Sequence, residues 1–280
     1  KILFLASIGL FLYVGLSLCA HNPDVVEKAI ISNVRIITPA AKNFKPYQDY
    51  IGSHLEILDM KTKNSRIVFS SPDSIQAPNW TADGKTLIYN SKGLLYNFDI
   101  ATGKTSILET GFANDNNNDH VLSWDGKQIG ISHHVKEDNR QSTIYLLPIT
   151  GSKKPVQISA TGAGHSYLHG FSPDDKKLVF TGGRNNVYDI YTIDIATKKE
   201  TRLTHSPDLD DGAEYSPDGK KIYFNSNRTG LMQLWRMDAD GKNQEQLTFD
   251  TYNNWFPHIS PDGKKIVFLT YHDGIDPNDH

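Results

Sequence analysis

Histidine, glutamate and arginine side chains recur at fixed distances from five aspartates in this chain of 280 residues. The aspartates follow one another at steps of 42, 49, 44 and 44 residues, and they are Asp83, Asp125, Asp174, Asp218 and Asp262. Four or five residues before four of them stand His120, His169, Glu214 and His258, and ten residues after two of them stand Arg184 and Arg228. Side chains that return at one place in a repeat are expected to line one surface.

These residue types suit a ligand or metal site. Imidazoles that converge near a carboxylate can hold a divalent cation. The predicted metal ligands are His120, His169 and His258, with Mn, Zn or Ca as the ion. The competing interpretation is structural, because histidines at strand starts often bond to nearby backbone. Trp255, three residues before His258, is predicted to stack on a sugar ring at the same surface or to pack in the core.

The strands that position these residues can be predicted from a sequence motif that surrounds each aspartate. A short strand runs into a Ser-Pro-Asp-Gly turn and continues as an alternating strand, which predicts a hairpin. Third strands are expected at 94–100, 142–148, 189–194 and 233–237, and fourth strands at 105–108, 156–158, 200–203 and 245–247. Four short strands in a period of forty-odd residues predict an all-β fold, a β-propeller of four-stranded blades.

The repeat resembles that of the TolB-like propellers, on the strength of SPDGKKIYFNSNRTGLMQLWRMDADGKNQEQLT at 216–248. The resemblance covers roughly 53–274. It implies six blades in the parent protein, of which four full ones and parts of two others lie in this chain. In such repeats an arginine at the position of Arg184 and Arg228 commonly braces the blade, whereas the alternative is an anion clamp. The same repeat also occurs in oligopeptidases and pectic-oligosaccharide lyases, so fold alone does not settle function.

The chain is predicted to have three parts. Residues 1–20 are a signal peptide, because 2–18 are almost wholly apolar and follow a Lys. Residues 21–52 are expected to be a linker with a short strand, and 53–280 to be the propeller, truncated at its C-terminal end. Strands at 54–60 and 66–70 lack a first and second strand, which either the hairpin at 257–269 or sequence beyond His280 would supply. Cys19 suggests a lipid anchor.

The function expected from these features is that of an exported binding or scaffold module, acting on a protein or carbohydrate polymer at the channel mouth. The location is the periplasm or outer membrane of a Gram-negative bacterium, and a monomer is expected. A formal net charge of −3 argues against nucleic acid as a partner. The alternatives are a metal-assisted propeller resembling oligogalacturonate lyases, with a metal that neutralises a uronate, and the propeller domain of an oligopeptidase.

Overall fold

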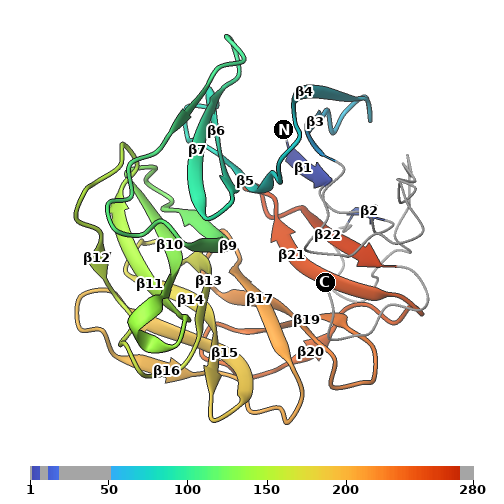
Figure 1. Ribbon diagram of the computed structural model, residues 1–280. Coiled ribbons are helices and arrows are strands. Elements are labelled where there is room, and N and C mark those ends of the chain that lie inside the picture. Colours follow the sequence, from blue (N-terminus) through green and yellow to red (C-terminus); the bar gives the residue numbers. More distant parts are fainter. Residues whose placement is uncertain (1, 7–11, 19–51, 272–280) are drawn as a thin grey trace, which may run out of the picture. The chain divides into compact units, whose positions relative to one another are not determined.

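The computed structural model describes residues 2–6, 12–18 and 52–271 of the chain (Figure 1). Within these ranges lie 22 strands and one 3-10 helix, Lys136–Asp138. The strands form four four-stranded and two three-stranded antiparallel sheets. The prediction of an all-β chain with four complete blades and parts of two others is therefore confirmed.

The four complete sheets each follow chain order. The first contains β5 (Gln76–Trp80), β6 (Thr86–Ser91), β7 (Leu94–Asp99) and β8 (Thr105–Ile107). The second contains β9 (Asn116–Leu122), β10 (Gln128–Val135), β11 (Gln141–Pro148) and β12 (Val156–Gln157). The third contains β13 (Ser166–Phe171), β14 (Lys177–Arg184), β15 (Val187–Asp194) and β16 (Glu200–Arg202). The fourth contains β17 (Asp210–Tyr215), β18 (Lys221–Ser226), β19 (Gln233–Asp238) and β20 (Glu245–Gln246).

The two three-stranded sheets include the apolar N-terminal segment. β1 (Ile2–Ala6) pairs with β3 (Ser53–Leu58), which pairs with β4 (Ser65–Ser71). β2 (Leu12–Leu18) pairs with β22 (Lys265–Tyr271), which pairs with β21 (Asn253–Ile259). The C-terminal hairpin is therefore not the partner of β3 and β4. Apolar and β-branched residues favour strands, so this segment can complete a sheet.

The predicted domain boundaries stay predictions. The segment expected to be a signal peptide contains β1 and β2. The expected linker, 21–52, lies outside the described residues except for Gly52. No helix in the described part of the chain has the length and apolar character needed to span a bilayer.

The described chain divides into two compact units, each with its own apolar core. One unit contains β1 and β3 to β12, and the other contains β2 and β13 to β22. In the first, Ile88 and Ile129 are fully buried in a cluster contributed by neighbouring sheets. In the second, Val179 and Phe224 occupy the equivalent cluster. Adjacent sheets in each unit thus share buried side chains, as sheets packed face to face do.

In five sheets the first two strands of each hairpin are joined by the same type of hydrogen-bonded turn. A Ser or Thr hydroxyl donates to the aspartate Oδ1 at 2.6–2.8 Å and accepts the N–H of the first residue of the next strand at 2.9–3.1 Å. The same Oδ1 accepts the N–H of a lysine two residues on. In four turns the residue after the aspartate is a glycine with φ of 68–71°, and in the third it is Asp175 with φ of 55°. The hydroxyl therefore ties both strands to the turn.

Substitution of Ser216 by Ala tests the contribution of this hydroxyl. Ser216→Ala removes a donor to Asp218 and an acceptor for the backbone N–H of Lys221. We expect the free energy of unfolding to fall by about 1–2 kcal/mol, measured by urea denaturation. Ser216→Thr is the matched control, because Thr81 makes the same contacts in the first turn. Equal losses for the two variants would contradict this role.

Protonation of Asp125 gives a pH-dependent test of the turn. The Lys127 side chain, its backbone N–H and the Ser123 hydroxyl all hydrogen bond to Asp125 and lower the pKa of its carboxyl to about 2. Because the folded-state pKa lies below the unfolded value of about 3.9, the contacts favour folding above pH 4. This contribution is lost as the pH falls from about 4 to about 2. We expect carboxyl NMR titration to show the low pKa, and Lys127→Met to raise it. An Asp125 pKa that Lys127→Met leaves unchanged would contradict the assigned cause.

Candidate functional site

The first strands of the sheets carry most of the predicted site residues, and each is interrupted by a β-bulge. The pairing register with the second strand shifts after Gln76, around His120, at His169, after Asp211 and after Trp255. A bulge bends its strand and redirects side chains, and bulges are common beside active sites. In the second unit β13 lies against β17 and β17 lies against β21 (Figure 1), so three of these bulged strands are neighbours.

Three bulges contain a residue in the left-handed region, in each case six positions before the turn aspartate. They are Ala77 (φ 45°), Gly212 (φ 66°) and Phe256 (φ 53°). Gly212 is also required by space, since a Cβ there would lie 2.3 Å from Oδ1 of Asn225. That oxygen accepts the backbone N–H of Phe256 at 2.9 Å. A left-handed conformation at a bulky residue such as Phe256 is strained, and such strain concentrates at functional sites.

His169 forms the more buried of two histidine–carboxylate pairs. Its Nε2 lies 2.9 Å from Oδ1 of Asp211, and both side chains are 11% exposed. The Thr181 hydroxyl donates to the same carboxylate oxygen at 2.6 Å. The His169 ring also packs on Phe256, with 6.1 Å between ring centroids. The orientation of His169 is therefore fixed by residues of three strands.

His258 forms the second pair, with Glu214 of the neighbouring first strand. Its Nδ1 lies 2.8 Å from Oε2 of Glu214. The His258 side chain is 69% exposed and Glu214 is 24% exposed. A polar ligand can thus reach the imidazole directly, and it would find a carboxylate beside it. The structure brings together the predicted residues His169, Glu214 and His258 on adjacent strands of one unit.

His120 has a structural role in the first unit. The ring is 2% exposed, with Nδ1 3.0 Å from the carbonyl oxygen of Asn118 and Nε2 3.3 Å from that of Ile88. Burial lowers the pKa of this imidazole, because desolvation penalises its charged form. The surroundings of His120 fit the structural interpretation, since both ring nitrogens lie near backbone carbonyls, and its role as a ligand stays a prediction.

Trp255 lies in the core of its unit. Its side chain is fully buried, and its ring packs against Phe256 with 5.5 Å between centroids. This burial agrees with the core interpretation, and stacking on a sugar ring stays a prediction. The acidic residues before Glu214 lie in β17, with Asp210 paired to Ser226 and Asp211 to Asn225.

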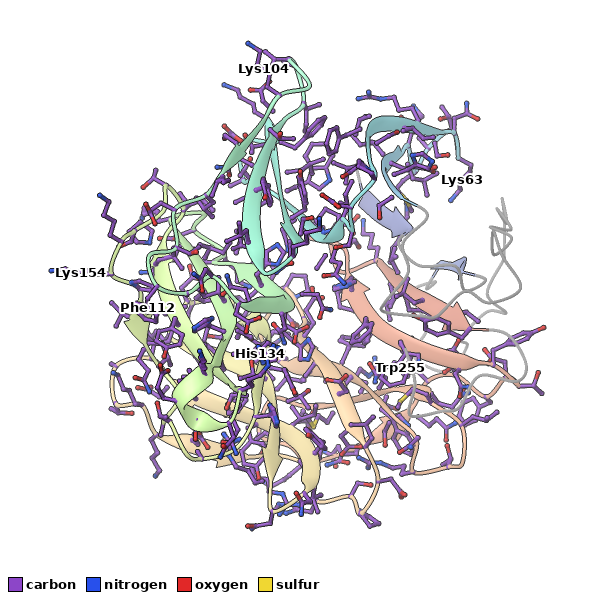
Figure 2. All side chains as sticks on the ribbon, in the orientation of Figure 1. Lys63, Lys104, Phe112, His134, Lys154 and Trp255 are labelled. Atoms are coloured by element: carbon purple, nitrogen blue, oxygen red, sulfur yellow. The ribbon has the colours of Figure 1, made fainter. Side chains whose placement is uncertain are left out.

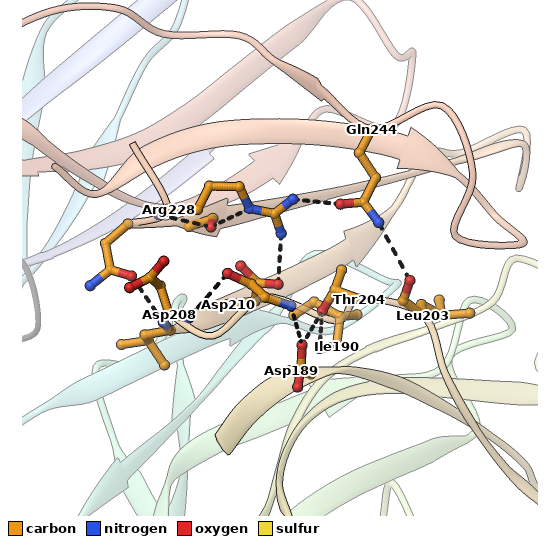
Figure 3. Close-up of polar contacts among 12 residues, drawn as sticks. Asp189, Ile190, Leu203, Thr204, Asp208, Asp210, Arg228 and Gln244 are labelled. Atoms are coloured by element: carbon orange, nitrogen blue, oxygen red, sulfur yellow. Dashed lines mark hydrogen bonds and ion pairs between the residues drawn. The ribbon is translucent and has the colours of Figure 1, made fainter. Parts of the chain in front are cut away.

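Arg184 and Arg228 brace their blades. Arg228 makes an ion pair with Asp210 at 2.7 Å and donates to Gln244 at 2.6 Å, and Gln244 in turn donates to the Leu203 carbonyl (Figure 3). Its guanidinium lies 4.7 Å from the Trp235 ring centroid. Burial raises the pKa of Asp210, although the hydrogen bond and charge of Arg228 oppose this. Arg228 therefore makes the bracing contacts that the resemblance implies, and its role as an anion clamp stays a prediction.

The same brace in the preceding blade has its carboxylate at a different position. Arg184 contacts Glu200 at 3.0 Å and the Ser166 hydroxyl at 3.0 Å. Counted from the turn aspartates, Glu200 corresponds to Gln244 and Ser166 corresponds to Asp210. Each arginine thus meets one carboxylate, which comes from the fourth strand in one blade and from the first strand in the next.

The predicted metal set has no matching cluster. No group of three or more His, Cys, Asp or Glu side chains that would hold a metal occurs in the described ranges. His169 and His258 are each paired with a carboxylate, and His120 belongs to the other compact unit. The role of a divalent ion stays a prediction.

Sequence reasoning missed Phe256, Thr181 and the bulges that aim the two histidines. Phe256 is the middle of three consecutive nonpolar residues in NNWFPHI, which break the strict alternation of a strand. Such a break is a signal for a bulge, but the residue type gave no sign that it would adopt a left-handed conformation. Thr181 lies in a buried strand and has no sequence feature that distinguishes it.

Repeated four-stranded sheets with a common turn define a β-propeller. A family model described as the TolB beta propeller domain matches residues 122–277, and the chain belongs to this family. A solved structure described as a putative TolB from Agrobacterium tumefaciens is 46% identical, with a TM-score of 0.75, and the match covers 79% of this chain and 78% of that one.

Two curated relatives match part of the chain. An uncharacterized protein of Agrobacterium fabrum is 46% identical over 164 residues, which are 58% of this chain and 54% of the relative. The Tol-Pal system protein TolB of Francisella tularensis is 26% identical over 174 residues, which are 60% of this chain and 37% of that protein. The chain thus spans about half or less of the length of these relatives.

The equivalence of the two arginine braces can be tested by moving the carboxylate from the first strand to the position of Gln244. Asp210→Ser leaves Arg228 without an anionic partner, and we expect about 3 kcal/mol of destabilisation, since breaking a mostly buried pair is costly. The double variant Asp210→Ser, Gln244→Glu copies the preceding blade and is expected to recover most of that loss. Urea denaturation of both variants and of Gln244→Glu alone measures the coupling. A double variant no more stable than Asp210→Ser would contradict the equivalence of the two braces.

Proposed function

We propose that this chain is an exported binding module, in which the first strands of the blades contact a protein or polymer of the cell envelope. The observation that carries the proposal is the strained bulge at Phe256 beside the two histidine–carboxylate pairs. At this bulge the His258 side chain is directed toward solvent, and the Phe256 ring packs on His169. A rigid, polar surface with one exposed imidazole offers both donors and acceptors to a partner.

The family supports a role in protein interaction. A relative is described as the TolB protein of a Tol-Pal system, and by analogy we place this chain in the envelope of a Gram-negative bacterium. Export agrees with the apolar stretch at 2–18 after Lys1. Periplasmic or outer-membrane-associated location, a possible lipid on Cys19 and a monomeric state all belong to this proposal.

Site-specific crosslinking tests where the partner binds. A photoreactive benzophenone amino acid replaces His258 in one strain and Phe249 in another, with the whole gene expressed in its own host. Phe249 is the matched control, because it lies in the same unit and is 76% exposed. We expect a discrete crosslinked envelope protein or polymer at position 258 and none at 249. The Glu214→Gln variant should weaken the crosslink at 258, since the carboxylate beside that position belongs to the proposed surface and loses its charge.

The outcomes separate the binding surface from general exposure. Equal crosslinking at 258 and 249 would show that the first-strand surface is not selective. No product at 258, in a protein that melts at the wild-type temperature, would overturn the proposed surface.

A further inference from the structure

Three aromatic side chains gather at one end of the sheet β13–β16, in the second unit. They are His165, which directly precedes β13, Tyr167 of β13 and Tyr188 of β15. The three ring planes are inclined by 12–30°, and the centroids are 5.2, 6.4 and 6.5 Å apart. In a single column the two outer rings would be separated by the sum of the other two distances. These rings are therefore displaced sideways, and together they form an aromatic platform.

The platform depends on a glycine in the strand between the rings. The Gly183 N–H donates to the His165 carbonyl at 2.9 Å, and Gly183 pairs with Tyr188 on its other side. A Cβ at Gly183 would lie 2.7 Å from the Tyr188 ring, so a side chain there would displace the ring. Counted from the turn aspartates, the blade β9–β12 has His134 at this place (Figure 2). The rings meet because Gly183 has no side chain.

Packing of a blade does not require three rings at these positions. Counted from the turn aspartate, the blade β17–β20 has Leu209, Asp211 and Met232 in their place. Met232 is fully buried, whereas each ring of the platform is half-buried and keeps accessible surface. Partly accessible rings are thus a feature of this blade and not of the repeat.

Polar groups without a partner in the described part of the chain lie beside the platform. Asn185 and Asn186 form the two-residue turn between β14 and β15, with φ of 54° and 62°. Both are exposed, and no described residue hydrogen bonds to either side-chain amide or to the Tyr188 hydroxyl. Arg184, next to this turn, is paired with Glu200 at 3.0 Å. The available groups are therefore amides and a phenol, which are uncharged at neutral pH.

An aromatic surface beside amide groups suits the ring of a neutral sugar. The C–H faces of a pyranose are apolar and stack on an aromatic ring, whereas the hydroxyls around its rim need donors and acceptors. A side-chain amide offers both. A phosphate or carboxylate group would instead need a cation, and the arginine of this turn already has a carboxylate partner.

We propose that this platform binds a neutral carbohydrate. One pyranose ring stacks on Tyr188, and the amides of Asn185 and Asn186 hydrogen bond to its hydroxyls. The other two rings hold the platform together, since the Tyr167 hydroxyl lies 3.0 Å from Nδ1 of His165. The site goes beyond the proposed function and does not depend on it, because the histidine–carboxylate pairs take no part.

NMR titration of the full chain tests the proposal. The probes are cellotriose, maltotriose and triacetylchitotriose, with N-acetyl-tryptophan amide as an aromatic probe that has no sugar hydroxyls. We expect weak, saturable binding of at least one oligosaccharide, with shifted amide signals at Asn185, Asn186 and Tyr188. Protons of the bound sugar should move upfield, because they lie over the face of an aromatic ring.

Two variants with matched controls locate the sugar. Tyr188→Leu removes the ring and should weaken binding about fivefold or more and abolish the upfield shifts, whereas Tyr188→Phe should retain them. Asn186→Gly suits the positive φ of the turn and removes one amide, so we expect about fivefold weaker binding at an unchanged melting temperature. Asn139→Gly is its control, because Asn139 is also exposed, has φ of 53° and lies in the other unit.

Four results would overturn the site. The first two are no saturable binding of any oligosaccharide and tighter binding of the tryptophan amide, which would indicate a peptide ligand. The others are sugar binding without upfield shifts, and sugar binding that Tyr188→Leu and Asn186→Gly both leave unchanged. Asn186→Gly keeps the test decisive if Tyr188→Leu fails to fold, because glycine is favoured in this turn.

Discussion

The hydrogen bond between a Ser or Thr hydroxyl and the turn aspartate fixes the rest of each blade. Because the same hydroxyl accepts the first N–H of the next strand, it sets which residue faces which across the first two strands. A slip of one residue would move every side chain of a strand to the opposite face. The constant positions of the arginine braces depend on this register.

The register explains why the fold could be predicted from the sequence. The turn residues and the alternation after them both have direct physical causes in backbone conformation and hydrogen bonding. The third and fourth strands lie within two residues of their predicted bounds. The N-terminal apolar segment was harder, because a stretch of Leu, Ile and Val suits a signal peptide and a strand alike.

The site was predictable only in part, because equal repeat positions do not have equal neighbours. His120 and His169 both lie five residues before a turn aspartate. The His169 ring lies beside the carboxylate of Asp211, whereas the His120 ring lies beside the carbonyls of Asn118 and Ile88. A histidine therefore pairs with a carboxylate in one case and with backbone carbonyls in the other. Spacing locates a side chain, and the adjacent blade decides its chemistry.

The arginine brace shows how such a repeat can diverge without losing stability. The cation needs one carboxylate in reach, and either the first or the fourth strand can provide it. An ancestor with acids at both positions would connect the two arrangements by single substitutions, and the arginine would be neutralised at every stage. Selection then acts on the charge of the blade rather than on any one residue, so repeat alignments scored position by position would miss it.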